Sequence, residues 1–304
     1  MTSASPARGL IALLRLPYWL MTGGLAVLTA FAILKGNFAD VSTTLGTMNV
    51  GMVALLTFFS MAFIASAGFA INDYFDRESD AVIKPKRPIP SGALSLGQVV
   101  AVTALLFALG LVMSALINWL SFAIIAVDSV LLLIYSYLVK RKSGFAANLL
   151  MGVLTGTAFV YGQATATGTV TLISATLYPI AFGTIGGNVL RDIFSMDGDA
   201  KVGYPTLPQR IGSVSAAKVG AVFFLLTGLL APLPAVPIFV GHFTIYYLPL
   251  ILVWSALLIY SSMRLMTVGS TVQNIRKYER MVTMSMMLLP LALIVEAALG
   301  GWLV

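Results

Sequence analysis

The chain of 304 residues is 59% hydrophobic and only 10% charged, with a mean hydropathy of +0.96. A soluble domain carries about 25% charged residues, so a water-soluble fold is excluded and much of the surface must face hydrocarbon. The absence of cysteine excludes disulfides, thiolate metal sites and cysteine nucleophiles. The net charge of +7 does not indicate nucleic acid, because a membrane protein needs Lys and Arg on its cytoplasmic side whatever its function.

Nine apolar runs along the chain are each long enough to cross about 30 Å of hydrocarbon. The predicted spans cover residues 16–35, 50–72, 97–117, 119–139, 146–166, 170–190, 214–236, 244–263 and 282–303. Helices are expected, because an open strand edge finds no hydrogen-bond partner in lipid and the runs lack an alternation of period two. The sequence therefore predicts an all-α polytopic membrane protein with nine transmembrane helices bundled around a central cavity.

The basic residues sort to one side of these spans. With the N-terminus inside, 17 of the 18 Lys and Arg residues fall on the same side and only Lys35 falls opposite. The positive-inside rule identifies that side as the cytoplasm. We therefore expect a multi-pass protein of the cell membrane whose N-terminus and whose loops 73–96, 191–213 and 264–281 are cytoplasmic.

The first two of these loops hold seven of the eleven carboxylates. Each is preceded by an Asn with an Asp four residues later, Asn72 with Asp76 and Asn188 with Asp192. Each then continues acidic and turns through a basic segment that contains Pro. Four spans lie between them, so both emerge on the same face with the same polarity. We interpret this as a weak repeat, at residues 72–80 and 188–199, within a single transmembrane domain of residues 1–304.

The acidic clusters have the spacing of a magnesium site. Asn72, Asp76 and Asp80 stand at i, i+4 and i+8, so on a continuing helix they line one face. Asp192 and Asp199 form a second such face. Stacked like charges repel unless a divalent cation lies among them, and oxygen ligands without His or Cys suit Mg²⁺. Two such faces suggest a diphosphate bridged through metal.

Basic residues accompany each cluster and could neutralise the same phosphates. They are Lys84, Lys86, Arg87, Arg191, Lys201 and Arg210. The plain alternative is a solvated cytoplasmic loop that carries ordinary positive-inside Lys and Arg. Two loops of matched polarity on one face favour the phosphate site.

Three motifs carry a family resemblance. The run NDYFDRESDAVIKPKRPIPSG, residues 72–92, resembles the NDxxDxxxD signature and KPxRPIPSG tail of the UbiA-type intramembrane prenyltransferases. The run DIFSMDGDAKVGYPTLPQRIG, residues 192–212, is similar to the second aspartate motif of that family, and YSYLVKRKSGFAAN, residues 135–148, to its YSxxxKR segment and the following Asn. Many relatives carry Asp where this chain has Ser195, and Asp197 is the candidate replacement.

The resemblance implies Mg²⁺-dependent transfer of a polyprenyl group from its diphosphate to a lipophilic acceptor. It implies catalytic roles for Asp76, Asp192 and Lys140, and metal ligation by Asp76, Asp80, Asp192 and Asp199. It implies substrate binding by Asn72, Asp73, Lys84, Arg87, Tyr135, Asn148, Asn188, Arg191 and Lys201. Candidate aromatic faces for an allylic cation are Tyr74, Phe75, Tyr135 and Tyr161.

Within the family, KPKRPIPSG together with DGDAKVGYPTLP resembles the digeranylgeranylglyceryl phosphate synthases. The expected donor is then geranylgeranyl diphosphate, and the expected acceptor is the hydroxyl of geranylgeranylglyceryl phosphate in ether-lipid synthesis. Membrane lipid surrounds the chain, and we expect neither nucleic acid nor an obligate protein partner. Because Ser195 stands in the second motif, a chlorophyll- or bacteriochlorophyll-synthase-like reaction is the first alternative, and quinone or haem prenylation is the next.

Two other classes fit parts of the sequence. Asp128 and Glu296 lie at membrane depth, where a carboxylate suggests function, so a cation-coupled transporter is an alternative. Transporter carboxylates should concentrate near the bilayer midplane, whereas seven of the eleven here lie at one membrane edge. The CDP-alcohol phosphotransferases also use membrane-edge aspartates with Mg²⁺, but the Asp197-Gly198 pair lacks their required downstream Ala-Arg.

Overall fold

Helices dominate the structure, which is a computed structural model of the whole chain. It describes residues 5–37, 39, 41–238, 240–267 and 271–303. Within this described part, nine helical segments are long and apolar enough to cross a membrane. They are Pro6–Leu34, Val50–Phe75, Leu96–Ile117, Trp119–Lys142, Gly144–Thr167, Leu172–Lys201, Ser213–Ala235, Leu248–Thr267 and Val272–Trp302. Each overlaps one predicted run, so the predicted helical class and the number of spans are confirmed.

The chain divides into two compact units. The first comprises Met1–Val27 and Ala39–Arg141, and the second comprises Leu28–Phe38 and Lys142–Val304. The first aspartate motif lies in the first unit and the second motif in the second unit. That residues 1–304 work as one prenyltransferase domain stays a prediction, as does the central cavity.

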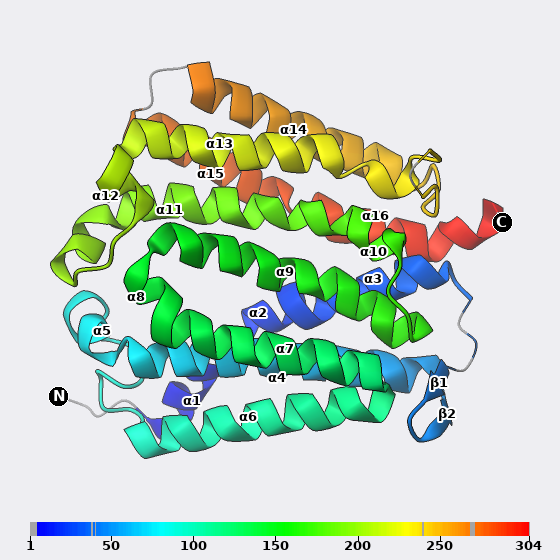
Figure 1. Cartoon of the computed structure of the whole chain (residues 1–304), viewed down its shortest axis with the longest axis horizontal. Coiled ribbons are helices and arrows are strands. Elements are labelled where there is room, and N and C mark those ends of the chain that lie inside the picture. The colour runs from blue at the N-terminus through cyan, green and yellow to red at the C-terminus, as the bar shows by residue number, and fades with distance from the viewer. Residues whose placement is uncertain (1–4, 38, 40, 239, 268–270, 304) are drawn as a thin grey trace. The chain divides into compact units, whose positions relative to one another are not determined.

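The first unit is built on a long helix, α4, against which α6 and α7 pack (Figure 1). Short helical pieces before α4 lie along it as well. The elements of this unit are α1 (Pro6–Leu14), α2 (Pro17–Trp19), the π-helix η1 (Leu20–Gly24), β1 (Val41–Thr43), β2 (Gly46–Met48), α4 (Val50–Phe75), α5 (Arg77–Ile83), α6 (Leu96–Ile117), α7 (Trp119–Ile134) and the π-helix η2 (Tyr135–Val139).

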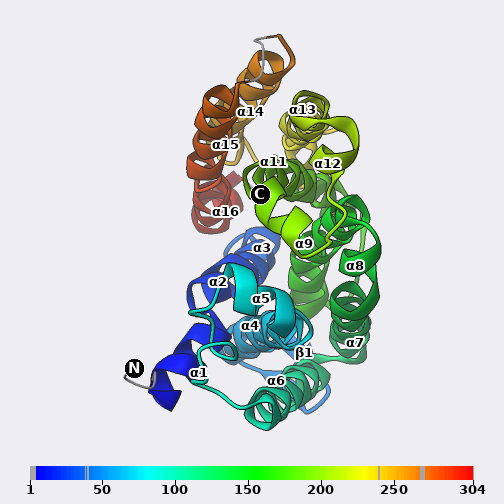
Figure 2. The same cartoon turned by 90° about the vertical axis from the view of Figure 1, so that its left-hand side faces the viewer.

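In the second unit α11 packs against both α9 and α13, and α14 packs against α13, α15 and α16 (Figure 2). The helix α3 (Leu25–Leu34) begins in the first unit and α8 (Lys140–Lys142) ends in the second. The other elements are α9 (Gly144–Thr167), α10 (Leu172–Leu177), η3 (Tyr178–Ala181), α11 (Phe182–Lys201), α12 (Leu207–Ile211), α13 (Ser213–Leu230), η4 (Leu233–Ala235), α14 (Leu248–Thr267), α15 (Val272–Ser285), α16 (Leu288–Leu299) and η5 (Gly300–Leu303).

Polar caps begin several of the membrane helices. The Asn49 side chain accepts a hydrogen bond from the second residue of α4, and Asn118 caps α7 in the same way through the backbone N–H of Ser121. Ser95 forms a reciprocal capping box with Gln98 at the start of α6. The first N–H groups of a helix have no intrahelical acceptor, so these caps fix where the spans start.

A glycine lets α11 and α13 approach closely. A Cβ atom on Gly186 would lie 2.7 Å from the backbone oxygen of Gly220 and 2.8 Å from the ring of Phe224. No real side chain fits at that distance, so only glycine allows this crossing. Small residues serve this purpose between membrane helices, where packing rather than water drives association.

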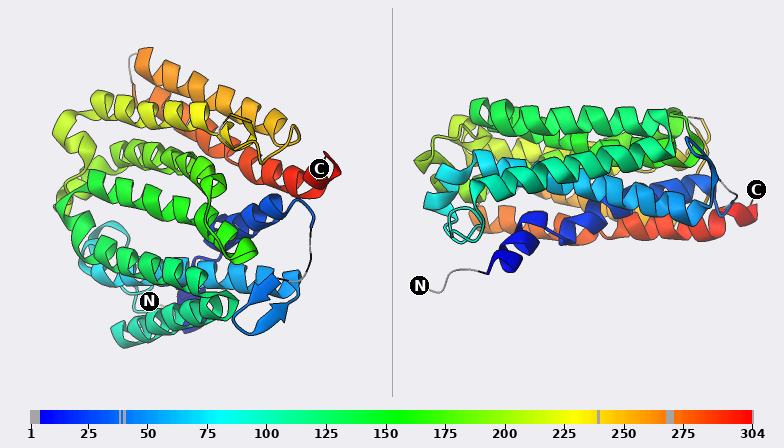
Figure 3. Two further views of the ribbon diagram at one scale, coloured as in Figure 1. Left: turned by 45° about the vertical axis from the view of Figure 1, so that its right-hand side comes forward. Right: turned by 90° about the horizontal axis from the view of Figure 1, so that it is seen from below.

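A short hairpin is the exception to the helical class. Strands β1 and β2 pair antiparallel with Ser42 opposite Thr47, beside the N-terminal end of α4 (Figure 3). Gly46 has a φ of +103°, a backbone conformation that a side chain would oppose. The segment was predicted only as a connection between spans, because three-residue strands are too short to show a period-two pattern.

Two predicted loops are largely helical. The helix α11 continues past the apolar run to Lys201, and α15 occupies much of the predicted loop 264–281. Hydropathy marks where a chain leaves hydrocarbon, but the backbone can continue its hydrogen bonds beyond that boundary. The second aspartate motif is therefore on a rigid helix rather than on a loop.

Candidate active site

The first aspartate cluster lies where α4 gives way to α5. The backbone N–H of Asp76 donates to the oxygen of Asn72 at 2.9 Å, and the N–H of Asp80 donates to the oxygen of Asp76 at 2.8 Å. Helical i to i+4 bonding therefore runs through the junction, although α4 ends at Phe75 and α5 begins at Arg77. The spacing of the motif is kept in three dimensions.

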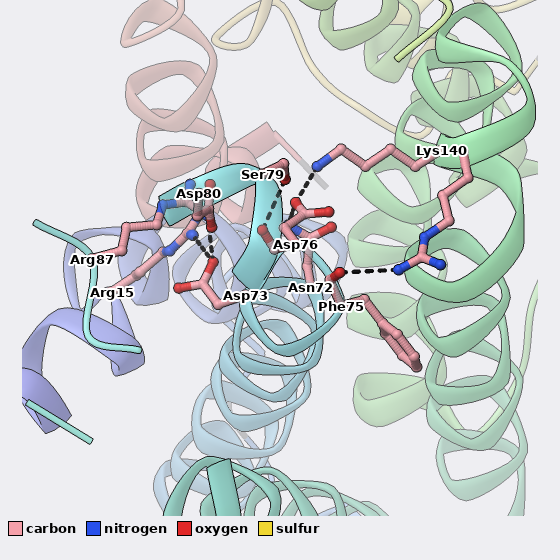
Figure 4. Close-up of polar contacts among 10 residues, drawn as sticks. Arg15, Asn72, Asp73, Phe75, Asp76, Ser79, Asp80, Arg87 and Lys140 are labelled. Atoms are coloured by element: carbon pink, nitrogen blue, oxygen red, sulfur yellow. Dashed lines mark hydrogen bonds and ion pairs between the residues drawn. The ribbon is translucent and has the colours of Figure 1, made fainter. Parts of the chain in front are cut away.

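Two arginines engage the carboxylates on one side of this junction (Figure 4). Arg15 Nη2 donates to Asp73 Oδ1 at 2.7 Å, and Arg87 Nη1 donates to the same oxygen at 2.7 Å and to Asp80 Oδ2 at 2.6 Å. Asp73 and Asp80 are both buried. Buried carboxylates need such partners, because an unpaired charge away from water is strongly destabilising.

The sequence offered no signal for Arg15. It ends α1 with a φ of +50°, a left-handed conformation rare for a side-chain-bearing residue, and its guanidinium lies 4.5 Å from the centre of the Phe69 ring. Such a conformation costs on the order of 1–3 kcal/mol and persists where surrounding contacts hold it. Here the ion pair with Asp73 and the burial of the neighbouring Leu13 in a core cluster with Ala70, Leu94 and Val99 hold it.

Lys140 and Asn72 engage Asp76 on the other side. Asn72 Nδ2 donates to Asp76 Oδ2 at 2.9 Å, and Lys140 forms an ion pair with the same oxygen. Lys140 directly follows the π-helix η2, which shifts the helical phase; such insertions are common at functional sites. The third motif is thus split, since Tyr135 and Lys140 belong to the first unit and Asn148 to the second.

The donor set of the first cluster fits Mg²⁺. Asn72 Oδ1 is buried and has no hydrogen-bond partner among the described residues, and its amide nitrogen is bonded to the Asp76 carboxylate. The Asp80 carboxylate instead pairs with Arg87 on the side of Asp73, so the predicted single face of Asn72, Asp76 and Asp80 is divided (Figure 4). Amide and carboxylate oxygens are the ligands that hard divalent cations prefer. Among the described residues no three acidic side chains form a ready-made metal cage, and the Asp80 and Asp76 carboxylates pair with Arg87 and Lys140.

Lys84 forms no ion pair among the described residues, although the Asp80 and Asp76 carboxylates attract its charge from a longer distance. It directly follows α5, and the residue is exposed. Partial burial, followed by the nearby Arg87 guanidinium, lowers the pKa of its ammonium group below the ordinary value. A cation without a direct ion pair at this position suits an incoming phosphate.

Raising the pH is expected to weaken the binding of inorganic pyrophosphate through Lys84. Because the pKa of Lys84 is lowered, its ammonium loses its proton before an ordinary lysine would, and anion affinity falls as pH rises through that pKa. Calorimetry on the purified protein from about pH 7 to about pH 10 checks this. Lys84→Arg stays charged and should flatten the profile, so identical profiles would contradict the role.

The second aspartate cluster lies on α11. Asn148 Nδ2, from α9, donates to Asp192 Oδ2 at 2.8 Å, which joins the Asn of the third motif to the Asp of the second. Ser195 Oγ donates to Asp199 Oδ2 at 2.5 Å. The serine that departs from the family pattern therefore orients an aspartate one helical turn away, while Asp197 is exposed.

Arg191 also lies on this helix and faces a residue that the sequence motifs do not include. Its Nε donates to Glu279 Oε1 at 3.2 Å, and its Nη1 donates to Asn188 Oδ1 at 3.3 Å. Lys201 is the exposed last residue of α11. Glu279 was missed because it stands among basic residues of a predicted loop, and only the packing of α15 on α11 reveals its partner.

The structure thus brings the predicted residues together in two groups, one in each unit. That both groups act on one diphosphate concerns the placement of the units and stays a prediction. Among the candidate aromatic faces, the Phe75 ring centre lies 5.5 Å from the Tyr137 ring centre, and the Arg141 guanidinium lies over the Phe75 ring. Tyr161 is fully buried.

A polytopic helical protein with two Asn- and Asp-led clusters, each accompanied by Lys or Arg, has the side chains that an intramembrane enzyme needs to hold a divalent cation and phosphate. The sequence model of the UbiA prenyltransferase family matches residues 26–289, which is most of the chain. The chain belongs to the UbiA prenyltransferase family, and the transporter and CDP-alcohol phosphotransferase alternatives are wrong.

Similar proteins agree with this assignment. The digeranylgeranylglyceryl phosphate synthase of Natronomonas pharaonis is 35% identical over 233 residues, which cover 75% of this chain and 77% of that protein. A solved structure described as that of a digeranylgeranylglyceryl phosphate synthase in membranes has a TM-score of 0.77 and 27% identity over 96% of this chain and 98% of its own.

A UbiA homologue from Archaeoglobus fulgidus, solved with GPP and Mg²⁺, has a TM-score of 0.62 and 19% identity, covering 94% of this chain and 99% of that one. This likeness shows the shared fold. With the nine apolar segments of the described residues, the family makes this chain a multi-pass membrane protein and a prenyltransferase.

Proposed function

We propose that this chain transfers a geranylgeranyl group from its diphosphate to the hydroxyl of geranylgeranylglyceryl phosphate, with Mg²⁺ as cofactor. The observation that carries the diphosphate chemistry is the first aspartate cluster, where the unpartnered Asn72 oxygen lies with Asp76 and Lys140. The acceptor rests on the 35% identity to a synthase of digeranylgeranylglyceryl phosphate.

Each residue group has a role in this proposal. Asn72, Asp76 and Asp80 in the first unit, with Asp192 and Asp199 in the second, would supply oxygen ligands to Mg²⁺. When bound, Mg²⁺ supplies positive charge to the diphosphate oxygens. Asn148 and Ser195 hold Asp192 and Asp199 in fixed orientations through their hydrogen bonds.

Basic side chains stabilise the leaving group. Lys140, Arg87 and Lys84 would donate hydrogen bonds to diphosphate oxygens as negative charge develops on them, and such preorganised donors contribute most where water is excluded. The bond between the prenyl carbon and the diphosphate oxygen breaks. The acceptor hydroxyl oxygen forms the new ether bond to that carbon, and its proton is released.

The side of the membrane follows from charge. Because 17 of 18 basic residues fall on the side of the aspartate motifs in a nine-span arrangement, we place the N-terminus and both motifs in the cytoplasm. A water-soluble isoprenoid diphosphate headgroup would then reach the site from the aqueous phase while its chain stays in lipid.

The test is an acceptor panel. Purified protein in detergent receives Mg²⁺, labelled geranylgeranyl diphosphate and one of three acceptors: geranylgeranylglyceryl phosphate, chlorophyllide or an aromatic acid. We expect a labelled ether lipid with the first acceptor only, and no product in excess chelator. Product from chlorophyllide or an aromatic acid alone would assign the chain to another branch of the family, and transfer undiminished by chelator would refute the metal.

A further inference from the structure

One face of α15 contacts the second aspartate cluster at two points. Glu279 receives the Arg191 Nε at 3.2 Å, and the Arg276 guanidinium lies 4.8 Å from the centre of the Phe194 ring. Arg276 and Glu279 are three residues apart on α15, so they lie on one face of that helix. Arg191 and Phe194 are likewise three residues apart on α11. The helix α15 therefore packs against the stretch of α11 that carries the second aspartate motif.

Glu279 is the fixed member of its ion pair. Its side chain is only 16% exposed, and its Oε1 also accepts a hydrogen bond from Thr283 Oγ1 at 3.1 Å, one turn further along α15. The Arg191 side chain is 53% exposed. A nearly buried carboxylate with a second donor holds its position, and the more exposed guanidinium is held by it.

The contacts of Arg191 leave one edge of its guanidinium available. Nε is taken by Glu279 and Nη1 by Asn188. Nη2 makes no hydrogen bond among the described residues and lies 3.9 Å from where a Cβ atom on Gly187 would stand. Because the five donors of a guanidinium form a rigid planar fork, holding Nε fixes where the Nη2 donors point.

We infer that Glu279 is a positioning residue that aims Arg191 at the diphosphate. The inference rests on the proposed function, and on the substrate-binding role that the family resemblance implies for Arg191. Glu279 touches no reacting atom itself; it holds the guanidinium plane so that less orientational freedom is lost when the anion binds.

Positioning and simple electrostatics predict opposite changes in anion affinity when Glu279 loses its charge. Glu279→Gln removes a negative charge near the site, so charge alone would make an anion bind more tightly. Loss of positioning makes it bind more weakly. The direction of the change therefore separates the two effects, and the isosteric side chain keeps the packing between α15 and α11.

The experiment measures binding of inorganic pyrophosphate with Mg²⁺ to the purified full chain by calorimetry. We expect about fivefold weaker binding for Glu279→Gln and about tenfold weaker binding for Arg191→Gln, as for lost charge-assisted contacts. In the Arg191→Gln background, Glu279→Gln should add nothing, because its effect passes through Arg191. Glu279→Asp, which keeps the charge, should recover part of the affinity.

Arg276→Gln is the matched control, since it removes the other contact between the same two helices. It should leave the affinity within about twofold of wild type, because a single exposed charge contributes little. The inference would be overturned, and the proposed function left standing, if Glu279→Gln bound pyrophosphate as tightly as wild type or more tightly. An equal loss of affinity from Glu279→Gln in the wild-type and Arg191→Gln backgrounds would have the same meaning. A wild-type chain that binds no pyrophosphate would overturn the proposed function as well.

Discussion

Replacing Asp76 by alanine is expected to abolish prenyl transfer while the protein remains folded. Asp76 accepts hydrogen bonds from Asn72 and pairs with Lys140, so it holds together the amide oxygen, the carboxylate and the ammonium group of the first cluster. Loss of a preorganised electrostatic contact of this kind lowers kcat by about 10²–10³-fold or more. Labelled product formation from geranylgeranyl diphosphate measures the loss.

The control for this prediction is Glu78→Gln, two residues further on. Glu78 is 88% exposed, and its single ion pair within the described part of the chain, to Arg77, is long at 3.4 Å, so its removal should leave the rate nearly unchanged. Asp76→Asn keeps the side-chain shape and guards against a folding defect. Rapid transfer by either Asp76 variant would show that this carboxylate is not part of the catalytic machinery.

Glu296→Ala is expected to destabilise the fold by roughly 2–4 kcal/mol, because it leaves donors without an acceptor. Glu296 is fully buried in α16 and accepts hydrogen bonds from both the backbone N–H of Thr244, at 2.9 Å, and its hydroxyl, at 2.7 Å. Both of its oxygens therefore hold the connection between α13 and α14 against the last membrane helix. Thermal unfolding in detergent measures the difference.

The same variant decides the role of a carboxylate at membrane depth. If Glu296 is structural, Glu296→Ala should bind inorganic pyrophosphate as wild type does at a temperature where both are folded. Thr244→Val removes one of the two hydrogen bonds and should have a smaller effect on stability. A variant as stable as wild type that has lost prenyl transfer would contradict the structural role and indicate a catalytic one.

Ser195 shows how a departure from a family motif can be accommodated. A serine cannot replace an aspartate as a charged metal ligand, but its hydroxyl donates to Asp199 at 2.5 Å and so orients the next carboxylate of the motif. The exposed Asp197, which the sequence suggested as a replacement, makes no such contact with another described residue. The second cluster thus keeps two carboxylates, Asp192 and Asp199, each with a neutral donor.

Composition and local spacing were sufficient for much of this protein. The hydropathy of the chain requires lipid-facing helices, because no other backbone structure except a closed barrel satisfies its own hydrogen bonds in hydrocarbon. The i, i+4 spacing of Asn72 and Asp76 specified their hydrogen bond, since helix geometry brings such neighbours together. These features depend on short stretches of chain, so they can be read without knowing the fold.

Partners far apart in sequence required the tertiary structure. Arg15 meets Asp73 across 58 residues, and Arg191 meets Glu279 across 88. Neither pair produces a periodic pattern in the sequence, where a charged residue at a membrane edge indicates only positive-inside sorting or a solvated loop. The packing of α1 on α4 and of α15 on α11 brings each residue to its partner. Helix packing depends on contacts summed over whole faces, and those sums decide which arginine neutralises which buried carboxylate.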